Sequence, residues 1–429
     1  MIRVEKTFIK SKNPHYKILA DYCYQARNLY NHANHVMREY YQQTGKIMAY
    51  TALDKELKND EQYPDYYRMP TVQSAQQTLR RLTKNWKAYT ETLKLKESGK
   101  VDHAVNPPKY IPKNKRYVLE LTNQDCKIKG DYVCFPKVFD DFTLKPACIH
   151  KDNFEELCQV RIVPNDDCIV AEVVYEITDV VEKEYNGRCV GIDIGVNQLL
   201  TVCNNVELPA IAINGRPLKE ENRWYNEQIN HYTIVNKAMN GSTSSKRINK
   251  LSRRRNAVIE DYLHKATTKV IDYCVENDIT KIVIGNAPVN KVMPKIIYNK
   301  DGHERYTKRE DNYFRVIPFQ KIIDYIKYKA ENKGISVDVV SELFTSTTSF
   351  IDGEIPDSFN HNPERRVNRG LFISNKGIKI DADLNAAYQI LNKKVSYKWN
   401  NGCALRPIIV NISNPNKSNV SNSALTNIT

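Results

Sequence analysis

The chain has 429 residues, and 64 Lys and Arg against 50 Asp and Glu leave a formal net charge of +14. This length allows about two or three domains, and 41% hydrophobic with 27% charged residues is typical of globular proteins, which excludes a disordered or fibrous chain. No apolar run approaches the roughly 18 residues of a membrane span, and MIRVEKTFIK lacks the apolar core of a signal peptide. We therefore expect a cytoplasmic protein without a membrane partner.

The cysteine pattern and the aromatic content narrow the class further. Ten cysteines are scattered without a CxxC pair, which predicts free thiols and no recognisable zinc site. Tyrosine supplies 27 of the aromatic residues. A basic chain rich in tyrosine suits nucleic acid, because Lys and Arg neutralise phosphates and aromatic rings stack on bases.

The N-terminal part reads as a strand followed by helices. Residues 1–10 alternate apolar and charged side chains as a strand does, and from about His15 to Lys96 the apolar spacing is helical. Thr71, after Pro70, is positioned to cap one of these helices. The polar face of that helix is either solvated or in contact with DNA, since Gln pairs with adenine edges and Lys or Arg with phosphate. The residues of this face that we expect at nucleic acid are Gln73, Gln77, Arg80 and Lys84.

Residues 106–185 predict a small β-domain behind a cationic loop. Short β-like runs cover residues 117–121, 132–135, 158–163 and 169–177, separated by turn residues. The N-terminal strand is expected to complete this domain, so that the helical part is inserted within it. The loop residues expected to bind nucleic acid are Lys109, Lys113 and Arg116.

From residue 188 the pattern changes to a mixed α/β sheet. The strands CVGIDIG, LLTVC and LPAIAIN come first, and strands at 281–285 and 335–340 then alternate with helices at 317–331 and 383–392. A long helix between these groups carries six cations within residues 246–255. Such a run is either a solvated face or a track for a phosphate backbone, and we expect Arg247 and Arg254 to contact nucleic acid.

Three acids stand where predicted strands end or a helix begins. Asp193 lies inside the apolar strand CVGIDIG, where a lone carboxylate costs several kcal/mol unless it is paired or binds a metal. Glu342 closes the run ISVDVVSE, and Asp383 begins the helix of KIDADLNAAYQIL. Taken singly, Asp383 is more typical of a helix cap or first-turn residue than of a metal ligand, and Glu342 is typical of an ordinary strand end. The set of three at one sheet edge is the informative feature.

Such a set matches metal-assisted cleavage of phosphodiester bonds. Carboxylate oxygens suit Mg²⁺, and two ions about 3.5–4 Å apart stabilise the attacking and leaving oxygens. The sequence contains no Ser/His/Asp pattern, P-loop or GxGxxG, which removes the main competing catalytic classes. We therefore expect Asp193, Glu342 and Asp383 to be the catalytic metal ligands, with Mg²⁺ as the ion and Mn²⁺ as a substitute. Asp352 is a reserve ligand and Asp381 a neighbouring control acid.

These residues resemble the TnpB family of transposon-encoded RNA-guided DNA endonucleases, the ancestors of miniature type V CRISPR effectors. GIDIGVNQLLTV is similar to the first RuvC motif, NGRPLKEENRWYN to the segment after the third strand, and DADLNAAYQILNK to the last RuvC motif. The resemblance covers roughly residues 1–395. It implies a protein of the prokaryotic cytoplasm, associated with the nucleoid, whose partners are a guide RNA and a target double-stranded DNA.

The resemblance also implies a fold. We expect an α/β multidomain protein in which an RNase H-like (RuvC) nuclease domain follows a helical recognition lobe inserted in a small β-barrel-like wedge domain. The expected boundaries are the wedge at 1–12 and 106–186, the recognition lobe at 13–105, the nuclease domain at 187–395 with an inserted target-loading loop at 343–380, and a disordered tail at 396–429.

The chain departs from the family pattern in two ways. The strand KIVIGN, which ends in Glu in most of the family, here has Gly285 and Asn286, and the four-cysteine zinc knuckle is absent from 343–380, where His361 is the single histidine. ELFTSTTSFIDGE instead resembles a sub-group whose second catalytic glutamate has moved one strand over, which implies Glu342 and no zinc. The basic residues Arg365, Arg366 and Arg369 are expected to hold this segment against nucleic acid.

The function implied is RNA-guided cleavage of double-stranded DNA next to a short adjacent motif, with base pairing to the guide reading the sequence. A nuclease-inactive, RNA-guided DNA-binding repressor is the alternative. A third possibility is an RNase H-like resolvase or integrase that works without RNA, although the separate N-terminal lobes argue against it. The sequence leaves open the source of the guide, the adjacent motif and the oligomeric state.

Overall fold

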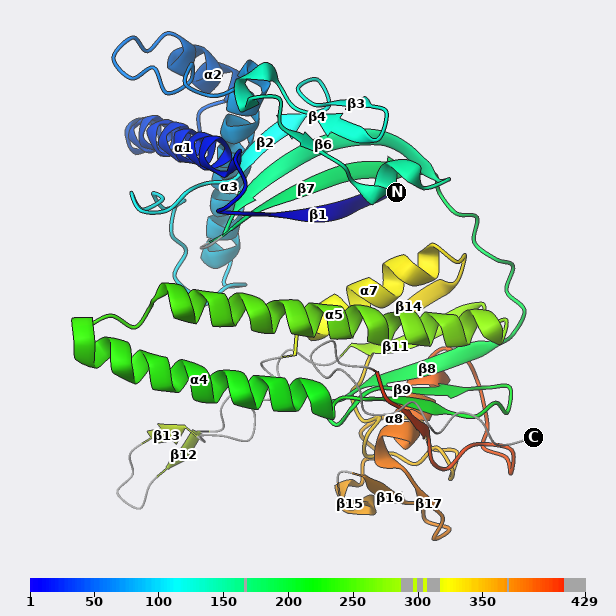
Figure 1. The fold of residues 1–429 in the computed structure, drawn as a ribbon. Coiled ribbons are helices and arrows are strands. Elements are labelled where there is room, and N and C mark those ends of the chain that lie inside the picture. Colours follow the sequence, from blue (N-terminus) through cyan, green and yellow to red (C-terminus); the bar gives the residue numbers. More distant parts are fainter. Residues whose placement is uncertain (166–167, 287–295, 299–303, 307–316, 369, 413–429) are drawn as a thin grey trace. The chain divides into compact units, whose positions relative to one another are not determined.

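A computed structural model describes residues 1–165, 168–286, 296–298, 304–306, 317–368 and 370–412 (Figure 1). The chain divides into two compact units, Met1–Asp179 and Val180–Thr429. Each is described by itself. None of the helices in the described ranges is long and apolar enough to cross a bilayer.

The first unit contains a four-stranded antiparallel sheet in the order β1-β7-β6-β2. β1 (Ile2–Lys10) pairs with β7 (Cys168–Ile177) along its whole length, and β7 pairs with β6 (Phe154–Pro164), which pairs with β2 (Leu119–Thr122). The N-terminal strand therefore belongs to the β-rich part, as predicted. A second, smaller sheet consists of β3 (Lys127–Lys129), β4 (Tyr132–Cys134) and β5 (Thr143–Leu144). Two 3₁₀ turns, η1 (Lys137–Phe139) and η2 (Ala147–His150), precede and follow β5 in the chain.

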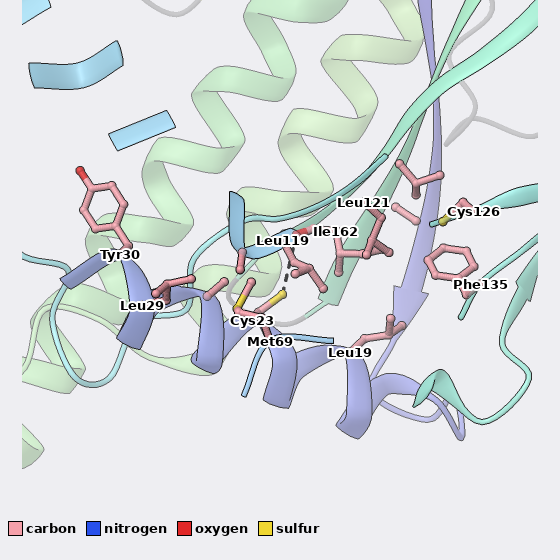
Figure 2. Close-up of a cluster of buried hydrophobic side chains, with 14 of the residues drawn as sticks. Leu19, Cys23, Leu29, Tyr30, Met69, Leu119, Leu121, Cys126, Phe135 and Ile162 are labelled. Atoms are coloured by element: carbon pink, nitrogen blue, oxygen red, sulfur yellow. Dashed lines mark hydrogen bonds between the residues drawn. The ribbon is translucent and has the colours of Figure 1, made fainter. Parts of the chain in front are cut away.

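Three helices lie between β1 and β2 in the chain: α1 (Tyr16–Thr44), α2 (Tyr50–Lys58) and α3 (Val72–Glu97). The Thr71 hydroxyl accepts a hydrogen bond from the Ser74 amide at 3.0 Å, which confirms the predicted cap of α3. One face of α1 packs on the sheet, with Leu19 and Cys23 against Leu121 and Ile162 (Figure 2). The Cys23 thiol donates to the Ile162 carbonyl at 3.7 Å, and burial raises the pKa of this thiol to about 12. This cysteine is a core residue.

The second unit contains a six-stranded mixed sheet in the order β14-β11-β8-β9-β10-β18. β8 (Cys189–Ile194), β9 (Gln198–Asn204) and β10 (Ile211–Asn214) are antiparallel, whereas β11 (Lys281–Asn286) runs parallel to both β8 and β14 (Ser336–Ser341). The mixed α/β sheet is therefore as the sequence predicts.

The expectation of a disordered tail is wrong for residues 396–412. β18 (Ile408–Val410) pairs in parallel with β10 from Ile211 to Ile213 and forms the edge of the large sheet. The sequence pattern missed this strand because it is three residues long and lies in a stretch rich in Asn and Ser. Residues 413–429 lie outside the described part.

Helices cover both faces of this sheet (Figure 1). α5 (Lys246–Glu276) and α7 (Phe319–Glu331) pack on one face, and α8 (Ala382–Asn392) packs on the other. Gly191 allows α8 to approach β8, because a Cβ atom there would lie 2.4 Å from the Ala387 carbonyl oxygen. α4 (Arg216–Asn240) forms a hairpin with α5. The remaining elements are β12 (Ile296–Tyr298), β13 (Glu304–Tyr306), η4 (Pro363–Arg365), β15 (Arg366–Asn368), β16 (Leu371–Ile373) and β17 (Lys379–Ile380).

Candidate active site

The alternation of β8 turns Asp193 toward α8. Val190, Ile192 and Ile194 belong to the core beneath α5 and α7, whereas Cys189 belongs to the core beneath α8. Asp193 has the parity of Cys189, and successive strand side chains point to opposite faces, so its carboxylate lies on the α8 face. Asp193 is half-buried there, opposite Thr201 of β9.

The direction of α8 brings Asp383 to the same end of β8. The Cβ position of Gly191 is closest to Ala387 and Leu391, whereas that of Gly195 lies 3.8 Å from the Asp383 carboxylate oxygen Oδ2. α8 therefore runs antiparallel to β8, and its first turn lies over the carboxyl end of that strand. The structure thus brings together Asp193 and Asp383, which are far apart in the sequence.

Glu342 follows β14 directly and has the same parity as Val340, which packs in the core beneath α8. Its side chain lies over β11, the strand between β14 and β8. A Cβ atom on Gly285 would be 2.6 Å from both Cγ and Oε1 of Glu342. Glu342 thus occupies the space that a side chain at position 285 would need. Glycine at position 285 makes this placement of Glu342 possible.

Lys393, at the C-terminal end of α8, holds the backbone on both sides of Glu342. Its ammonium donates to the Ser341 carbonyl at 2.7 Å and to the Leu343 carbonyl at 2.9 Å. Burial lowers the pKa of Lys393, and the negative charge of Glu342 opposes that shift. The sequence analysis missed this residue, since a lysine after a helix is an ordinary surface feature.

Asp381 and Asp383 have different roles although they are two residues apart. The Asp381 carboxylate caps α8 by accepting from the amides of Asp383 and Leu384, and it also accepts from Gln198 Nε2 at 2.9 Å. Asp383 lies in the first turn, where its Oδ1 is 3.0 Å from Nη2 of Arg366. Asp381 is therefore the helix cap, and the carboxylate of Asp383 is directed to the site.

The three acids offer an all-oxygen donor set, which is the set that Mg²⁺ prefers. Their oxygens do not all lie within 4.8 Å of one another; among the described residues, the group that meets this distance is Glu156, Cys158 and Glu176 in the first unit. A pair of ions about 3.5–4 Å apart needs ligands spread more widely than one ion does. The arrangement on the α8 face fits such a pair in donor chemistry.

The segment 343–380 is organised by a buried ion pair. Arg365 makes two hydrogen bonds to Glu354, at 2.6 and 2.8 Å, and lies 3.8 Å from Asp352. Asp352 also accepts from the Asn375 amide at 2.8 Å, so this reserve ligand is engaged within the segment. The expectation that Arg365 faces nucleic acid together with its neighbours is wrong, because its side chain is 10% exposed and bonded inside the segment. Arg369 lies outside the described residues.

In the first unit the structure gathers several of the predicted nucleic-acid residues around one cavity of about 490 Å³. Gln73 instead bonds to Gln124 at 3.3 Å and is not part of this lining. Sequence reasoning missed the contributions of the sheet, because contacts between α3 and β6 are distant in sequence. The lining consists of Gln77, Arg80, Arg81, Lys84, Asn85, Tyr117, Glu120, Gln159 and Arg161.

The other predicted cations are distributed over both units. Lys109 and Lys113 are exposed, and the Arg116 guanidinium lies 5.0 Å from the centroid of the Tyr24 ring. Arg247 lies 4.1 Å from the Tyr232 centroid and Arg254 5.2 Å from that of Trp224, so both link α5 to α4. Their role at nucleic acid stays a prediction.

The fold and site define an α/β multidomain protein whose mixed sheet carries three acids on one face. Among solved structures, that of a Cas12f1–sgRNA–target DNA complex aligns with 89% of this chain and 83% of that chain at 15% identity and a TM-score of 0.56. The structure of the mini-RNA-guided endonuclease CRISPR-Cas_phi3 covers 92% and 93% at 11% identity and a TM-score of 0.45. The first similarity shows a shared fold.

Sequence families give the narrower assignment. Residues 172–290 match OrfB_IS605, described as a probable transposase, and residues 319–390 match the Cas12f1-like TNB domain. No curated protein matches the chain. The two family matches confirm the resemblance to the TnpB family. Asp193 lies in the first matched segment, and Glu342 and Asp383 lie in the second.

Proposed function

We propose that the protein is an RNA-guided endonuclease that cleaves double-stranded DNA next to a short adjacent motif. The observation that carries this proposal is the placement of Glu342 over Gly285, on the sheet face that Asp193 and Asp383 share. The family matches and the shared fold with a Cas12f1 complex support it.

Asp193, Glu342 and Asp383 would hold Mg²⁺, for which Mn²⁺ can substitute; the ions stabilise charge that develops on the phosphodiester. The surrounding residues position these acids. Lys393 fixes the backbone at Glu342, and Asp381 fixes the first turn of α8 beneath Asp383. Arg366 of β15 forms an ion pair with Asp383, and this pair links segment 343–380 to the acids that would act on the DNA strand.

The domain roles follow from the same proposal. The β-rich parts at 1–12 and 106–186 serve as a wedge that binds RNA, and residues 13–105 as a recognition lobe. Residues 187–395 form the nuclease domain, with 343–380 as the target-loading loop. Guide RNA and target DNA are the partners, and base pairing between them supplies sequence specificity.

We expect Gln77→Ala to relax the preference for one base of the adjacent motif. Gln77 lines the cavity of the first unit with Gln159 and Asn85, and amide side chains pair with base edges at about 1–3 kcal/mol of discrimination. Binding to a randomised motif library measures the preference. Gln73→Ala is the matched control on the same helix, because Gln73 bonds to Gln124 instead. An unchanged motif profile for Gln77→Ala places motif readout elsewhere.

The purified protein should carry RNA. A net charge of +14 with cations gathered along exposed surfaces favours a polyanion, and phosphate contacts account for most of such affinity. Sequencing of the copurified RNA, followed by DNA cleavage before and after its removal, tests this. Equal cleavage by RNA-free protein would favour the resolvase, whereas guided binding without any cleavage would favour the repressor.

A further inference from the structure

A cavity of about 440 Å³ lies at the start of α4, apart from the three acids. Arg216, Lys219 and Arg223 line it at helical spacings of three and four residues, so they share one face of the helix. Glu220 and Asn197 are the other described residues of the lining. Three cations against one acid give the cavity a net positive charge.

The first turn of α4 strengthens this positive field. It contains no acidic residue, although acids are the residues that a helix N-terminus favours. Arg216 and Lys219 lie there instead, so their charge adds to the positive end of a 25-residue helix. An anion bound in the cavity gains from both sources of charge.

The cavity is tied to the candidate active site through the turn between β8 and β9. The Gly215 amide, which precedes α4, donates to the Asn197 carbonyl at 2.8 Å. Gly195 of the same turn lies beside Asp383, whose Oδ2 is 3.8 Å from the Cβ position of that glycine. The cations and the carboxylates therefore flank one short turn at the carboxyl end of β8.

The composition of the lining indicates the ligand. Arg binds phosphate with paired N–H donors, and residues seven positions apart on a helix are separated by about 10.5 Å, which leaves room for more than one phosphate. None of the described lining residues is aromatic, so stacking on bases does not contribute. The cavity of the first unit has a different lining, with amide side chains that can pair with base edges and the aromatic ring of Tyr117.

We propose that this cavity binds the phosphate backbone of the single DNA strand entering the nuclease site and sets its position relative to the three acids. The inference rests on the proposed nuclease function and adds a substrate-positioning subsite to it. Because the contacts are to phosphates, the subsite holds the strand independently of its sequence.

The first test measures binding of a single-stranded oligodeoxynucleotide at increasing salt concentrations. Each phosphate contact to a single strand contributes about 0.7 to the slope of log K against log salt, so Arg216→Gln with Arg223→Gln should reduce the slope by about 1.4. Lys237→Gln with Lys269→Gln removes the same charge from exposed positions of α4 and α5 and should leave the slope unchanged. Equal slopes for the two double variants, or loss of copurified RNA from the first, overturn the proposal.

The second test locates the phosphates. Single-turnover cleavage of a guided target should fall at least tenfold in the Arg216→Gln, Arg223→Gln variant. Replacing one phosphate next to the cleavage position by a neutral methylphosphonate should lower the cleavage rate of the unmutated protein by a similar factor. The same replacement should not lower the rate of the variant any further. Full additivity of the two changes rejects the contact. If the unmutated protein does not cleave DNA but the salt slopes of the two double variants differ as expected, the DNA-strand subsite is supported and the nuclease proposal is rejected. If the unmutated protein cleaves DNA but the two salt slopes are equal, the nuclease proposal is supported and the subsite is rejected.

Discussion

Glu342→Gln is expected to reduce Mg²⁺-dependent cleavage of a guided target by about a thousandfold or more. The metal stabilises transition-state charge by several kcal/mol, and each 1.36 kcal/mol corresponds to about a factor of ten in rate. The amide keeps the size of the side chain but removes the negative charge that holds the ion. Guided binding should persist, because Lys and Arg contacts to phosphates supply that affinity. Cleavage and target binding are measured in parallel on the same preparations.

Asp381→Asn is the matched control. Asn is as good a helix cap as Asp, because its one side-chain oxygen can still accept from the amides of Asp383 and Leu384, so α8 keeps its first turn. The hydrogen bond from Gln198 is lost, because it is made to the other carboxylate oxygen of Asp381. We expect cleavage to fall far less than in Glu342→Gln. Rates near those of the unmutated protein for Glu342→Gln would refute its assignment as a ligand. An unmutated protein that binds its guided target tightly without cutting would favour the repressor.

The sequence predicted the main elements of the second unit because their signals are local. Short apolar runs gave β8, β9, β11 and β14, and an alanine-rich helical pattern gave α8. Asp193 was identified because an acid inside an apolar strand is costly, and Glu342 and Asp383 because they stand at the end of a strand and the start of a helix. The parity that turns Asp193 and Glu342 to the same face follows from the strand period once the register is known.

Features that depend on contacts between distant segments could not be predicted. Lys393 acts on Glu342 through two backbone carbonyls of another element, which no local pattern reveals. The buried ion pair of Arg365 with Glu354 could not be predicted either, because a run of basic residues in a polar segment is typical of an exposed surface. Gly285 carried a signal, since a glycine replaced the expected acid, but the side chain that occupies its space became evident from the fold.

The cationic cavity beside the active site illustrates the same limit. The spacing of Arg216, Lys219 and Arg223 is visible in the sequence, yet it is also typical of a solvated helix face. The fold distinguishes the two readings by placing this face next to the turn that carries Asn197. By contrast, Arg247 and Arg254 share an equally basic segment but lie against aromatic rings of α4.

Lys393→Met is expected to raise the Mg²⁺ concentration needed for half-maximal cleavage by about 10- to 100-fold. Residues that orient metal ligands without binding the metal typically contribute that much to metal affinity or activity. The substitution keeps the apolar stem but removes both hydrogen bonds, at 2.7 and 2.9 Å, that fix the backbone on either side of Glu342. The carboxylate then has to be ordered by the ion itself, which weakens binding of the ion more than it changes cleavage at saturating Mg²⁺.

Two further variants separate positioning from general stability. Lys393→Arg keeps donors for the Ser341 and Leu343 carbonyls and should recover part of the Mg²⁺ affinity, whereas a purely structural loss would not depend on donors in this way. Lys394→Met removes the adjacent, exposed lysine and should leave the Mg²⁺ dependence unchanged. Mg²⁺ titrations of single-turnover cleavage, with thermal unfolding measured for each variant, provide the readout. Identical Mg²⁺ dependence for Lys393→Met and Lys394→Met would show that Glu342 is held in place without Lys393.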